Sequence, residues 1–357
     1  MSVFLDKKLA SLVPYTPGEQ PRDIKNLLKL NTNESPYPPS PRVIEAISAS
    51  EVFDLRLYSD PRCTRLVEAI AEYNSVEPSN VLPGNGSDEV LAFCFHGLCE
   101  SGAVFPDISY DFYSVYSEMF GVRYTRIPLR EDFTIAVKDY AGQRGTVFIA
   151  NPNAPTGIAL PLADIEALLL QDASRLVVID EAYVDFGADS AAALLDRYAN
   201  LLVVRTFSKS HSLAGARIGY AMGSSELIAD LNTLKFSFNP YNLNRLSILA
   251  GAAAIADREY YAETRRKTIA TREYTTDALR EYGFAVLDSR TNFIFAGGNP
   301  KIHARDYFAK LRENGILVRY FPSPRIDNYV RISMGTMKDM RRLADVTGTI
   351  LGGNGNA

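Results

Sequence analysis

Asp180, Lys209 and Asn153 lie in three polar clusters, and each cluster follows directly on a short apolar run. A carboxylate, an amine and an amide are groups that bind or activate small polar molecules. In an open parallel sheet, ligands bind beyond the carboxyl ends of the strands, so clusters at these positions would meet at one edge. Taken singly, each has an ordinary explanation as a helix cap, a surface charge or a turn. Together they predict a site at the ends of residues 146–150, 175–179 and 201–204.

A fourth cluster, residues 84–89, precedes a helical pattern over residues 90–98. Glycine lets the backbone approach a ligand closely, and the free N–H groups of a helix start attract anions. A serine or aspartate in this place is also an ordinary helix cap. The segment does not match the dinucleotide pattern G-x-G-x-x-G, because Glu89 stands where the third glycine belongs, and it is not a nucleotide-binding P-loop. It therefore predicts an anion site and does not indicate a nucleotide.

These groups together suit one cofactor. A lysine near a phosphate site, with a carboxylate on a neighbouring strand, is the arrangement for a Schiff base to pyridoxal 5′-phosphate. Lys209 would carry the cofactor, and Asp180 would keep its pyridine nitrogen protonated. The cluster at residues 84–89 would hold the 5′-phosphate.

The apolar runs that position these clusters are continuous and do not alternate with polar residues, which is typical of strands buried on both faces of a parallel sheet. Helical patterns over residues 163–170 and 191–197 separate them. Alternation of strand and helix predicts an α/β fold. A proline-rich connector, residues 33–41, precedes this region.

The pattern changes after about residue 240. A long helical region over residues 244–282, with a break near Asp257, leads to separated strand patterns at 284–287, 292–296 and 318–321. We therefore expect a large domain over residues 41–240. A smaller α+β domain would combine residues 1–40 with residues 241–357.

Composition excludes several classes of protein. Lys and Arg number 38 against 42 Asp and Glu, for a formal charge of −4, and without a basic stripe no nucleic-acid binding is expected. No apolar run approaches the roughly 18 residues of a membrane span, and residues 1–8 hold no signal-peptide core. Cys63, Cys94 and Cys99 lack paired spacing and the three histidines form no His-x-x-x-His pair, so neither a disulfide framework nor a metal site is expected. We expect a cytoplasmic protein with reduced thiols.

Sequence motifs extend from about Pro14 to Thr336, which is nearly the whole chain. The most specific are residues 179–183 and the segment 205–209 followed by 213–217. With them the sequence resembles the fold-type I pyridoxal-phosphate aminotransferases, and most of all the histidinol-phosphate aminotransferase family. The resemblance implies a mostly parallel seven-stranded sheet between helices, with a smaller α+β domain. The supporting motifs are residues 30–36, 57–61, 239–244 and 330–336.

The resemblance also implies a role for each matching residue at the cofactor. Lys209 would bind it covalently and move the reacting proton, while Asp180 would pair with the ring nitrogen. Tyr183 would hydrogen-bond the 3′-oxygen. Tyr110 would stack on the ring, although packing in the core explains a tyrosine there equally well. The phosphate would be held by Gly86, Ser87, Asp88, Ser208 and Arg217.

Substrate contacts and a homodimer follow from the same resemblance. Arg319 and Arg331 match residues that bind substrate anions, and Tyr15 and Asn33 accompany them; for Arg319 a solvated strand-end charge is the alternative. Tyr58 matches a residue that reaches the cofactor phosphate of the neighbouring subunit, in a pair that shares two equivalent sites. The implied reaction moves the amino group of L-histidinol phosphate to 2-oxoglutarate in two half-reactions.

The sequence departs from the family pattern in two places. The family has an asparagine directly before Pro-Thr-Gly, bonded to the cofactor's 3′-oxygen, but here Ala154 stands there and Asn153 precedes it. Either Asn153 reaches the ring through a shifted turn, or that hydrogen bond is missing. His211, two residues after Lys209, is expected to pack near the cofactor and not to react.

Alternatives with the same cofactor residues remain. An aromatic or other amino-acid aminotransferase and a threonine-phosphate decarboxylase differ from the first reading only in the substrate pocket. A non-catalytic, cofactor-binding regulatory module is disfavoured by Lys209 and by the early start of the substrate-type segment, which leaves no room for a DNA-binding domain.

Overall fold

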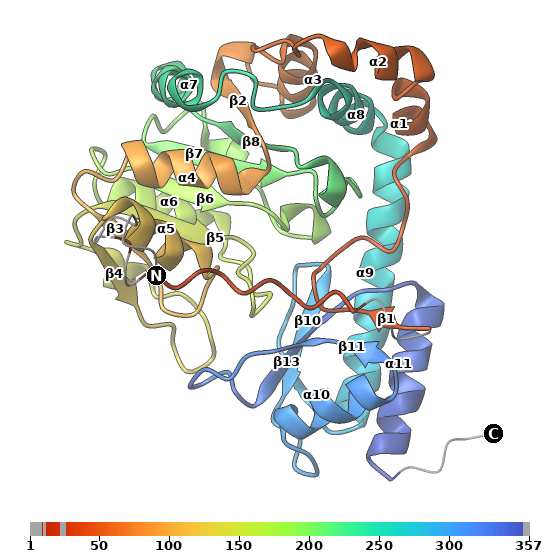
Figure 1. Cartoon of the computed structure of the whole chain (residues 1–357). Coiled ribbons are helices and arrows are strands. Elements are labelled where there is room, and N and C mark those ends of the chain that lie inside the picture. Colours follow the sequence, from red (N-terminus) through yellow and green to blue (C-terminus); the bar gives the residue numbers. More distant parts are fainter. Residues whose placement is uncertain (1–8, 10–11, 22–25, 353–357) are drawn as a thin grey trace.

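A seven-stranded sheet is the largest element of the computed structural model, which describes residues 9, 12–21 and 26–352. Its strand order is β2-β8-β7-β6-β5-β3-β4 (Figure 1). Strand β8 is antiparallel to both of its neighbours, and the other pairs are parallel. The mostly parallel α/β sheet predicted from the apolar runs is confirmed. The strands are β2 (Val81–Gly84), β3 (Ala103–Pro106), β4 (Tyr124–Ile127), β5 (Thr146–Ala150), β6 (Val177–Asp180), β7 (Leu201–Thr206) and β8 (Gly219–Met222).

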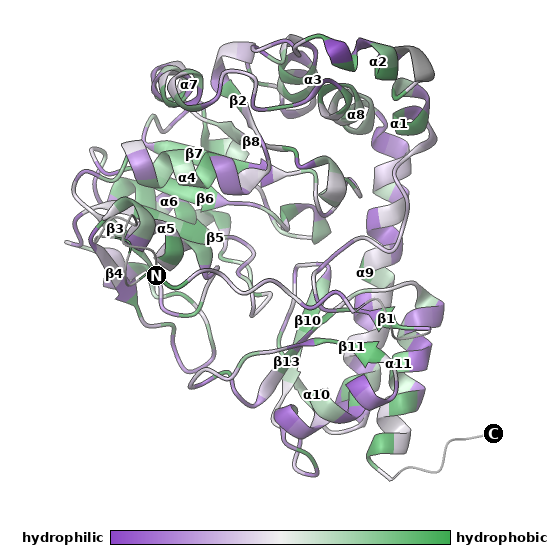
Figure 2. Ribbon diagram, viewed as in Figure 1, coloured by the Kyte–Doolittle hydropathy of each residue, from purple (hydrophilic) through white to green (hydrophobic). Residues whose placement is uncertain are grey.

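Helices cover both faces of this sheet, which is why its central strands are apolar until their carboxyl ends. In β7, Leu201 and Val203 pack into one hydrophobic core, and Leu202 and Val204 into the other. Because neighbouring side chains of a strand point to opposite faces, neither face needs polar residues. Figure 2 shows the apolar strands in green between the helices. One face carries α3 (Thr64–Asn74), α6 (Leu162–Leu170) and α8 (Arg245–Ala256), and the other carries α4 (Ser87–Gly97), α5 (Phe112–Phe120) and α7 (Ser225–Phe238).

The smaller part has its own core around a four-stranded antiparallel sheet of order β12-β13-β10-β9. The N-terminal segment joins this part, because β1 pairs in parallel with β11. Helix α9 runs from the large part to the small one (Figure 1). The elements are β1 (Leu28–Lys29), α9 (Arg258–Glu281), β9 (Ala285–Val286), β10 (Phe293–Gly297), α10 (Ala304–Glu313), β11 (Ile316–Leu317), β12 (Arg319–Tyr320), β13 (Tyr329–Ser333) and α11 (Met337–Ile350), while α1 (Pro41–Ala46) and α2 (Ala49–Phe53) lie near α8.

Two details differ from the expectations. Residues 191–197 form only a 3-10 turn, η6 (Ala191–Leu194), whose first N–H donates to the Glu181 carboxylate at 2.6 Å. The predicted break at Asp257 separates α8 from α9, yet α8 packs in the core of the large sheet, on the other side of the expected boundary at 240. The two cores are joined by α9, which places Tyr261 in the large core and Leu279 in the small one.

In the described part of the chain, no helix is long and apolar enough to cross a membrane. Among the same residues, no group of three His, Cys, Asp or Glu side chains is arranged to hold a metal ion. Cys63, Cys94 and Cys99 are buried free thiols, and burial raises the pKa of Cys63 to about 11. Residues 1–8, on which the signal-peptide prediction depends, lie outside the described residues.

Candidate active site

A cavity of about 250 Å³ lies at the carboxyl ends of β5, β6 and β7, where the small part faces the large sheet. The strand-end clusters and the start of α4 meet there, as the sequence predicted. Side chains of the N-terminal segment and of β12 and β13 close the other side. The predicted site residues that line the cavity are Tyr15, Asn33, Ser87, Asp88, Tyr110, Asp180, Tyr183, Ser208, Lys209, Arg217, Arg319 and Arg331.

Lys209 lies three residues beyond the end of β7 and points toward the N-terminal segment. Its Nζ donates a hydrogen bond to the Thr32 carbonyl at 3.3 Å and lies 5.8 Å from the centre of the Tyr183 ring. Tyr183 is itself held by Asn33, whose Nδ2 donates to the phenol oxygen at 3.0 Å. The amine and the phenol therefore face the same space.

Asp180, the last residue of β6, is a buried carboxylate that faces the cavity. Burial raises its pKa to about 7, although hydrogen bonds from the Tyr113 hydroxyl and the Ala182 N–H, both at 3.2 Å, oppose the rise. Among the described residues no lysine, arginine or histidine forms an ion pair with it. A buried acid without a cation gains most from a positively charged ligand, and the pyridinium nitrogen of pyridoxal phosphate fits that need.

Two glycines beside the start of α4 have no room for a side chain. Gly86 has φ +80°, and a Cβ built on it would lie 2.5 Å from Nη2 of Arg217. A Cβ on Gly219 would lie 2.2 Å from the backbone nitrogen of Ser87. The first N–H groups of a helix have no partners within the helix, so this cradle presents donors at close range. With Ser208 and Arg217 beside it, the cradle fits a phosphate group.

Tyr110 and Arg217 both bind the Asp88 side chain. The Tyr110 hydroxyl donates to Oδ1 at 2.8 Å, and Arg217 Nη2 contacts Oδ2 at 3.0 Å. Burial raises the pKa of Tyr110, and the charge of Asp88 raises it further, so the phenol stays protonated as a donor. Its position in the wall of the cavity is compatible with the predicted stacking role.

Two arginines form the positive end of the cavity. Arg319 donates to the Thr16 carbonyl at 3.3 Å and Arg331 to the Asn31 carbonyl at 3.2 Å, and both guanidinium groups lie 5.6 Å from the centre of the Phe321 ring. Nε of Arg331 is buried and has no hydrogen-bond partner among the described residues. Burial lowers the pKa of Arg331. A buried donor without a partner is costly, so this end of the cavity is suited to an anion.

Three predicted residues do not line the cavity. The Asn153 amide binds other protein groups: Nδ2 donates to Thr156 in its own loop and to the Ile108 carbonyl after β3, while Oδ1 accepts from Ser109. Ala154 lines the cavity in its place. Gly86 contributes backbone just below the surface of the cavity, and Tyr58 is exposed and stacks on another tyrosine outside it.

Other residues of the site were not predicted, because no motif or pattern in the sequence marked them. Tyr113 donates a hydrogen bond to Asp180 from α5, a distant helix that no motif of the sequence linked to it. Thr32 acts through its carbonyl, which any residue possesses. Phe321 lies near both arginines because the pairing of β12 with β13 brings Arg319 and Arg331 together. His211 packs between Phe207 and Tyr261, as a packing residue should, and burial lowers its pKa to about 4.

Comparison with known proteins agrees with this geometry. The family model of class I and II aminotransferases matches residues 25–346. The chain belongs to this family. It is 52% identical to the histidinol-phosphate aminotransferase of Brachyspira hyodysenteriae, over 95% of this chain and 96% of that protein. It is 51% identical to the histidinol-phosphate aminotransferase of Gluconacetobacter diazotrophicus, over 98% of this chain and 99% of that protein.

A similar solved structure contains pyridoxal phosphate. The crystal structure of histidinol-phosphate aminotransferase from Sinorhizobium meliloti in complex with pyridoxal-5′-phosphate has a TM-score of 0.87 to this chain, with 26% identity and 98% of each chain covered. The aminotransferase is therefore a fold-type I, pyridoxal-phosphate-dependent enzyme, and the predicted fold, enzyme class and cofactor are confirmed.

Proposed function

We propose that the enzyme transfers the amino group of L-histidinol phosphate to 2-oxoglutarate, which yields imidazole acetol phosphate and L-glutamate, a reaction of histidine biosynthesis. The observation that carries this proposal is the positive end of the cavity, with the unpaired buried Nε of Arg331 and the neighbouring Arg319. Histidinol phosphate has no α-carboxylate but carries a phosphate dianion. It therefore needs cations separate from those that hold the cofactor, and the two arginines are separate from the cradle at α4.

The side chains divide the work of the reaction. Bound pyridoxal phosphate supplies an electron sink that weakens the C–H bond next to the transferred amino group. Asp180, ionised beside a cationic ring nitrogen, holds the proton on that nitrogen. Lys209 Nζ would take the proton from that carbon and deliver it to the cofactor carbon that had been bonded to the lysine, so that the amino group stays with the cofactor. Tyr183, fixed by Asn33, places its hydroxyl near the lysine.

Arg331 is expected to serve both substrates, because 2-oxoglutarate and glutamate also present a carboxylate to the positive end. Arg319→Ala should lower kcat/KM for histidinol phosphate more than for glutamate. The expected loss for histidinol phosphate corresponds to roughly 2–5 kcal/mol. Arg331→Ala should weaken both. Arg266→Ala is a matched control, because this arginine pairs on the surface of α9 with Glu263.

Steady-state kinetics of both half-reactions measure these effects. The proposal of a phosphate-binding end fails if Arg319→Ala leaves kcat/KM for histidinol phosphate within about twofold of the wild type while Arg331→Ala lowers it.

We also propose a homodimer in which Tyr58 completes the site of the partner subunit. Tyr58 is 81% exposed, and its ring stacks on Tyr241 with centroids 4.5 Å apart. Phe53 and Phe238 are 80% and 77% exposed. Large exposed apolar side chains of this kind are typical of an interface between subunits.

Complementation tests the shared site. Tyr58→Ala and Lys209→Ala subunits, each inactive alone, should regain activity when co-expressed, because a mixed dimer has one intact site. Activity no higher than that of either parent would contradict the sharing of residues between subunits.

The proposed location is the cytoplasm. The three buried free thiols support it, since a reducing compartment preserves them. Cell fractionation with a tagged chain should recover the enzyme with cytoplasmic markers, and recovery with secreted proteins would contradict it.

A further inference from the structure

The segment that carries Lys209 is anchored at every second residue. Ser208 accepts a hydrogen bond from Thr206 Oγ1 at 3.0 Å, and Ser212 donates to Ser35 Oγ at 2.9 Å. Between them, Ser210 donates to the carboxylate of Asp185. These partners belong to β7, to the N-terminal segment and to the turn after Tyr183. Lys209 is therefore flanked on one side by a contact to the end of its own strand and on the other by contacts to two separate segments.

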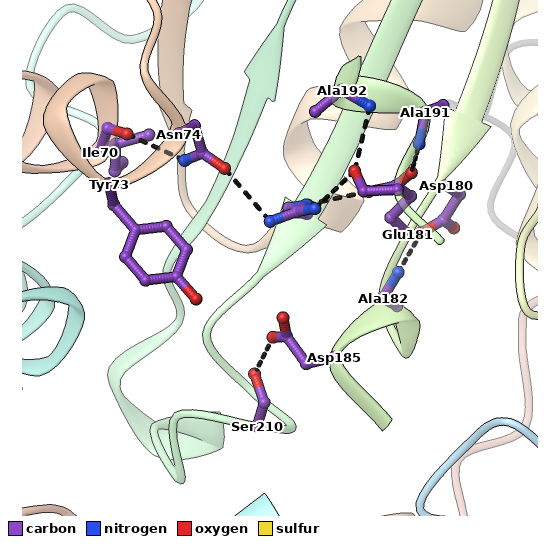
Figure 3. A network of polar contacts seen from close by, with 12 residues as sticks. Ile70, Tyr73, Asn74, Asp180, Glu181, Ala182, Asp185, Ala191, Ala192 and Ser210 are labelled. Atoms are coloured by element: carbon purple, nitrogen blue, oxygen red, sulfur yellow. Dashed lines mark hydrogen bonds and ion pairs between the residues drawn. The ribbon is translucent and has the colours of Figure 1, made fainter. Parts of the chain in front are cut away.

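The contact with Asp185 is the one that connects Lys209 to the other cofactor residues. Asp185 lies in η5 (Val184–Phe186), directly after the segment that carries Asp180 and Tyr183. Figure 3 shows Ser210 and Asp185 facing each other beside this segment. The other carboxylate oxygen of Asp185 lies 3.5 Å from Nη1 of Arg265 on α9. One carboxylate thus joins the two cofactor-binding segments and the helix that links the two parts of the molecule.

The direction of the hydrogen bonds around Ser210 is fixed by its single proton. Because that proton goes to Asp185, the 3.1 Å contact between Ser210 Oγ and Nδ1 of His211 requires the histidine to donate. Burial lowers the pKa of His211 to about 4, so the ring is neutral at pH 7 with its proton on Nδ1. The chain of donors runs from His211 through Ser210 to Asp185.

Charges from several elements face Asp185. Burial would raise the pKa of Asp185, but the charges of Arg205 on β7 and Arg265 on α9, together with the hydrogen bond from Ser210, outweigh burial and lower it. The neutral His211 ring and Tyr220 on β8 also face this group. Arg205 is fixed in turn by Glu181, with Nε and Oε2 2.9 Å apart. Asp185 is therefore an ionised acceptor at neutral pH.

A small cavity lies beside the segment that carries Lys209. Lys209, Ser210 and Arg265 line a space of about 10 Å³, close to the volume that one water molecule needs. Lys209 therefore borders this small cavity as well as the active-site cavity.

We propose that Asp185, acting through Ser210, is a positioning residue that fixes the Lys209 amine relative to Asp180 and Tyr183. Its negative charge, next to the lysine segment, also favours the protonated form of the cofactor-bearing nitrogen. The proposal rests on Lys209 as the cofactor-binding lysine and is independent of which amino donor the enzyme uses.

Two variants test it with cofactor readouts that need no substrate. Asp185→Asn keeps the shape and removes the charge, and it should lower the midpoint pH of the holoenzyme's visible absorbance transition by at least about half a pH unit. Ser210→Ala should weaken pyridoxal phosphate binding to the apoenzyme at least about fivefold, measured by fluorescence titration. Ser210→Thr, which keeps the hydroxyl, should restore that affinity.

Ser190→Ala is the matched control. It removes a hydroxyl from the same polar network, where Ser190 binds Glu181 and Arg205, but does not contact the lysine segment. The control should change the melting temperature alone. The proposal is overturned if Asp185→Asn and Ser210→Ala behave like the control, with wild-type midpoint pH and cofactor affinity. If Ser210→Ala does not fold, Asp185→Asn decides by itself, because an unchanged midpoint pH refutes the charge argument.

Discussion

Replacing Asp180 with asparagine should stabilise the apoenzyme at alkaline pH while it abolishes cofactor function. Burial raises the pKa of Asp180 to about 7 from an ordinary value of 3.8. The folded protein thus keeps a proton that the unfolded chain releases above about pH 4, so stability falls as the pH rises from 4 to 7. A difference of about 3 pH units, at about 1.36 kcal/mol each, amounts to about 4 kcal/mol. Roughly half of this loss falls between pH 5.5 and 8.

Asparagine has the same shape and no charge, so Asp180→Asn should remove this pH dependence. Urea unfolding of the apoenzyme at pH 5.5 and pH 8, followed by circular dichroism, measures it. The wild type should lose about 2 kcal/mol more than the variant over this interval, and added pyridoxal phosphate should reverse the loss only in the wild type. Asp230→Asn, on the exposed face of α7, is the control. Parallel pH profiles for wild type and Asp180→Asn would refute the view of Asp180 as a buried acid that awaits a cation.

Two further predictions concern the lysine and the cradle. Borohydride reduction should fix the cofactor to the peptide that contains Lys209, and Lys209→Ala should yield no covalently labelled peptide; a labelled peptide in the variant would show that another residue binds the cofactor. Gly219→Ala should weaken cofactor affinity by at least about tenfold or lower the melting temperature, because its Cβ would lie 2.2 Å from the Ser87 nitrogen, whereas Gly215→Ala, with nothing within 4 Å, should do neither. Equal behaviour of the two alanine variants in both assays would contradict the close approach at the cradle.

The residues at the strand ends could be predicted because their signal is local. Asp180 and Lys209 each follow a continuous apolar run, and parallel strands bring their carboxyl ends to one edge. The start of α4 could be predicted equally well, since Gly86 and Ser87 come directly before a helical pattern. For these positions, spacing along the chain is enough to imply nearness in space.

Contacts between distant segments could not be predicted in this way. Tyr113 reaches Asp180 from a helix on one face of the sheet, and Asp185 meets Ser210 across 25 positions of sequence. Neither contact has a periodic signal. Asn153 illustrates another limit, because the two alternatives for its amide differ only in the course of one turn, which follows from hydrogen bonds to Ser109 and Thr156.

The boundary between the two parts was also beyond sequence reasoning. Helix α8 is apolar around most of its circumference, so its pattern shows that it is buried but does not show in which core. Its contacts with α3 and α1 place it on the large sheet. The expected boundary at 240 followed a change in the pattern of helices and strands along the sequence. In the structure, the chain passes from the large core to the small one along α9.

The central claim is that this aminotransferase acts on a phosphorylated amino donor held by Arg319 and Arg331. Single half-reactions of the holoenzyme, followed by cofactor absorbance with histidinol phosphate, histidinol, tyrosine, phenylalanine and threonine phosphate, test it most directly. Histidinol phosphate should react with the highest second-order rate constant, at least about 30-fold above histidinol, because the unphosphorylated compound offers no anion to the two arginines. A higher value for tyrosine or phenylalanine, or a loss of carbon dioxide from threonine phosphate faster than reaction with histidinol phosphate, would contradict the claim.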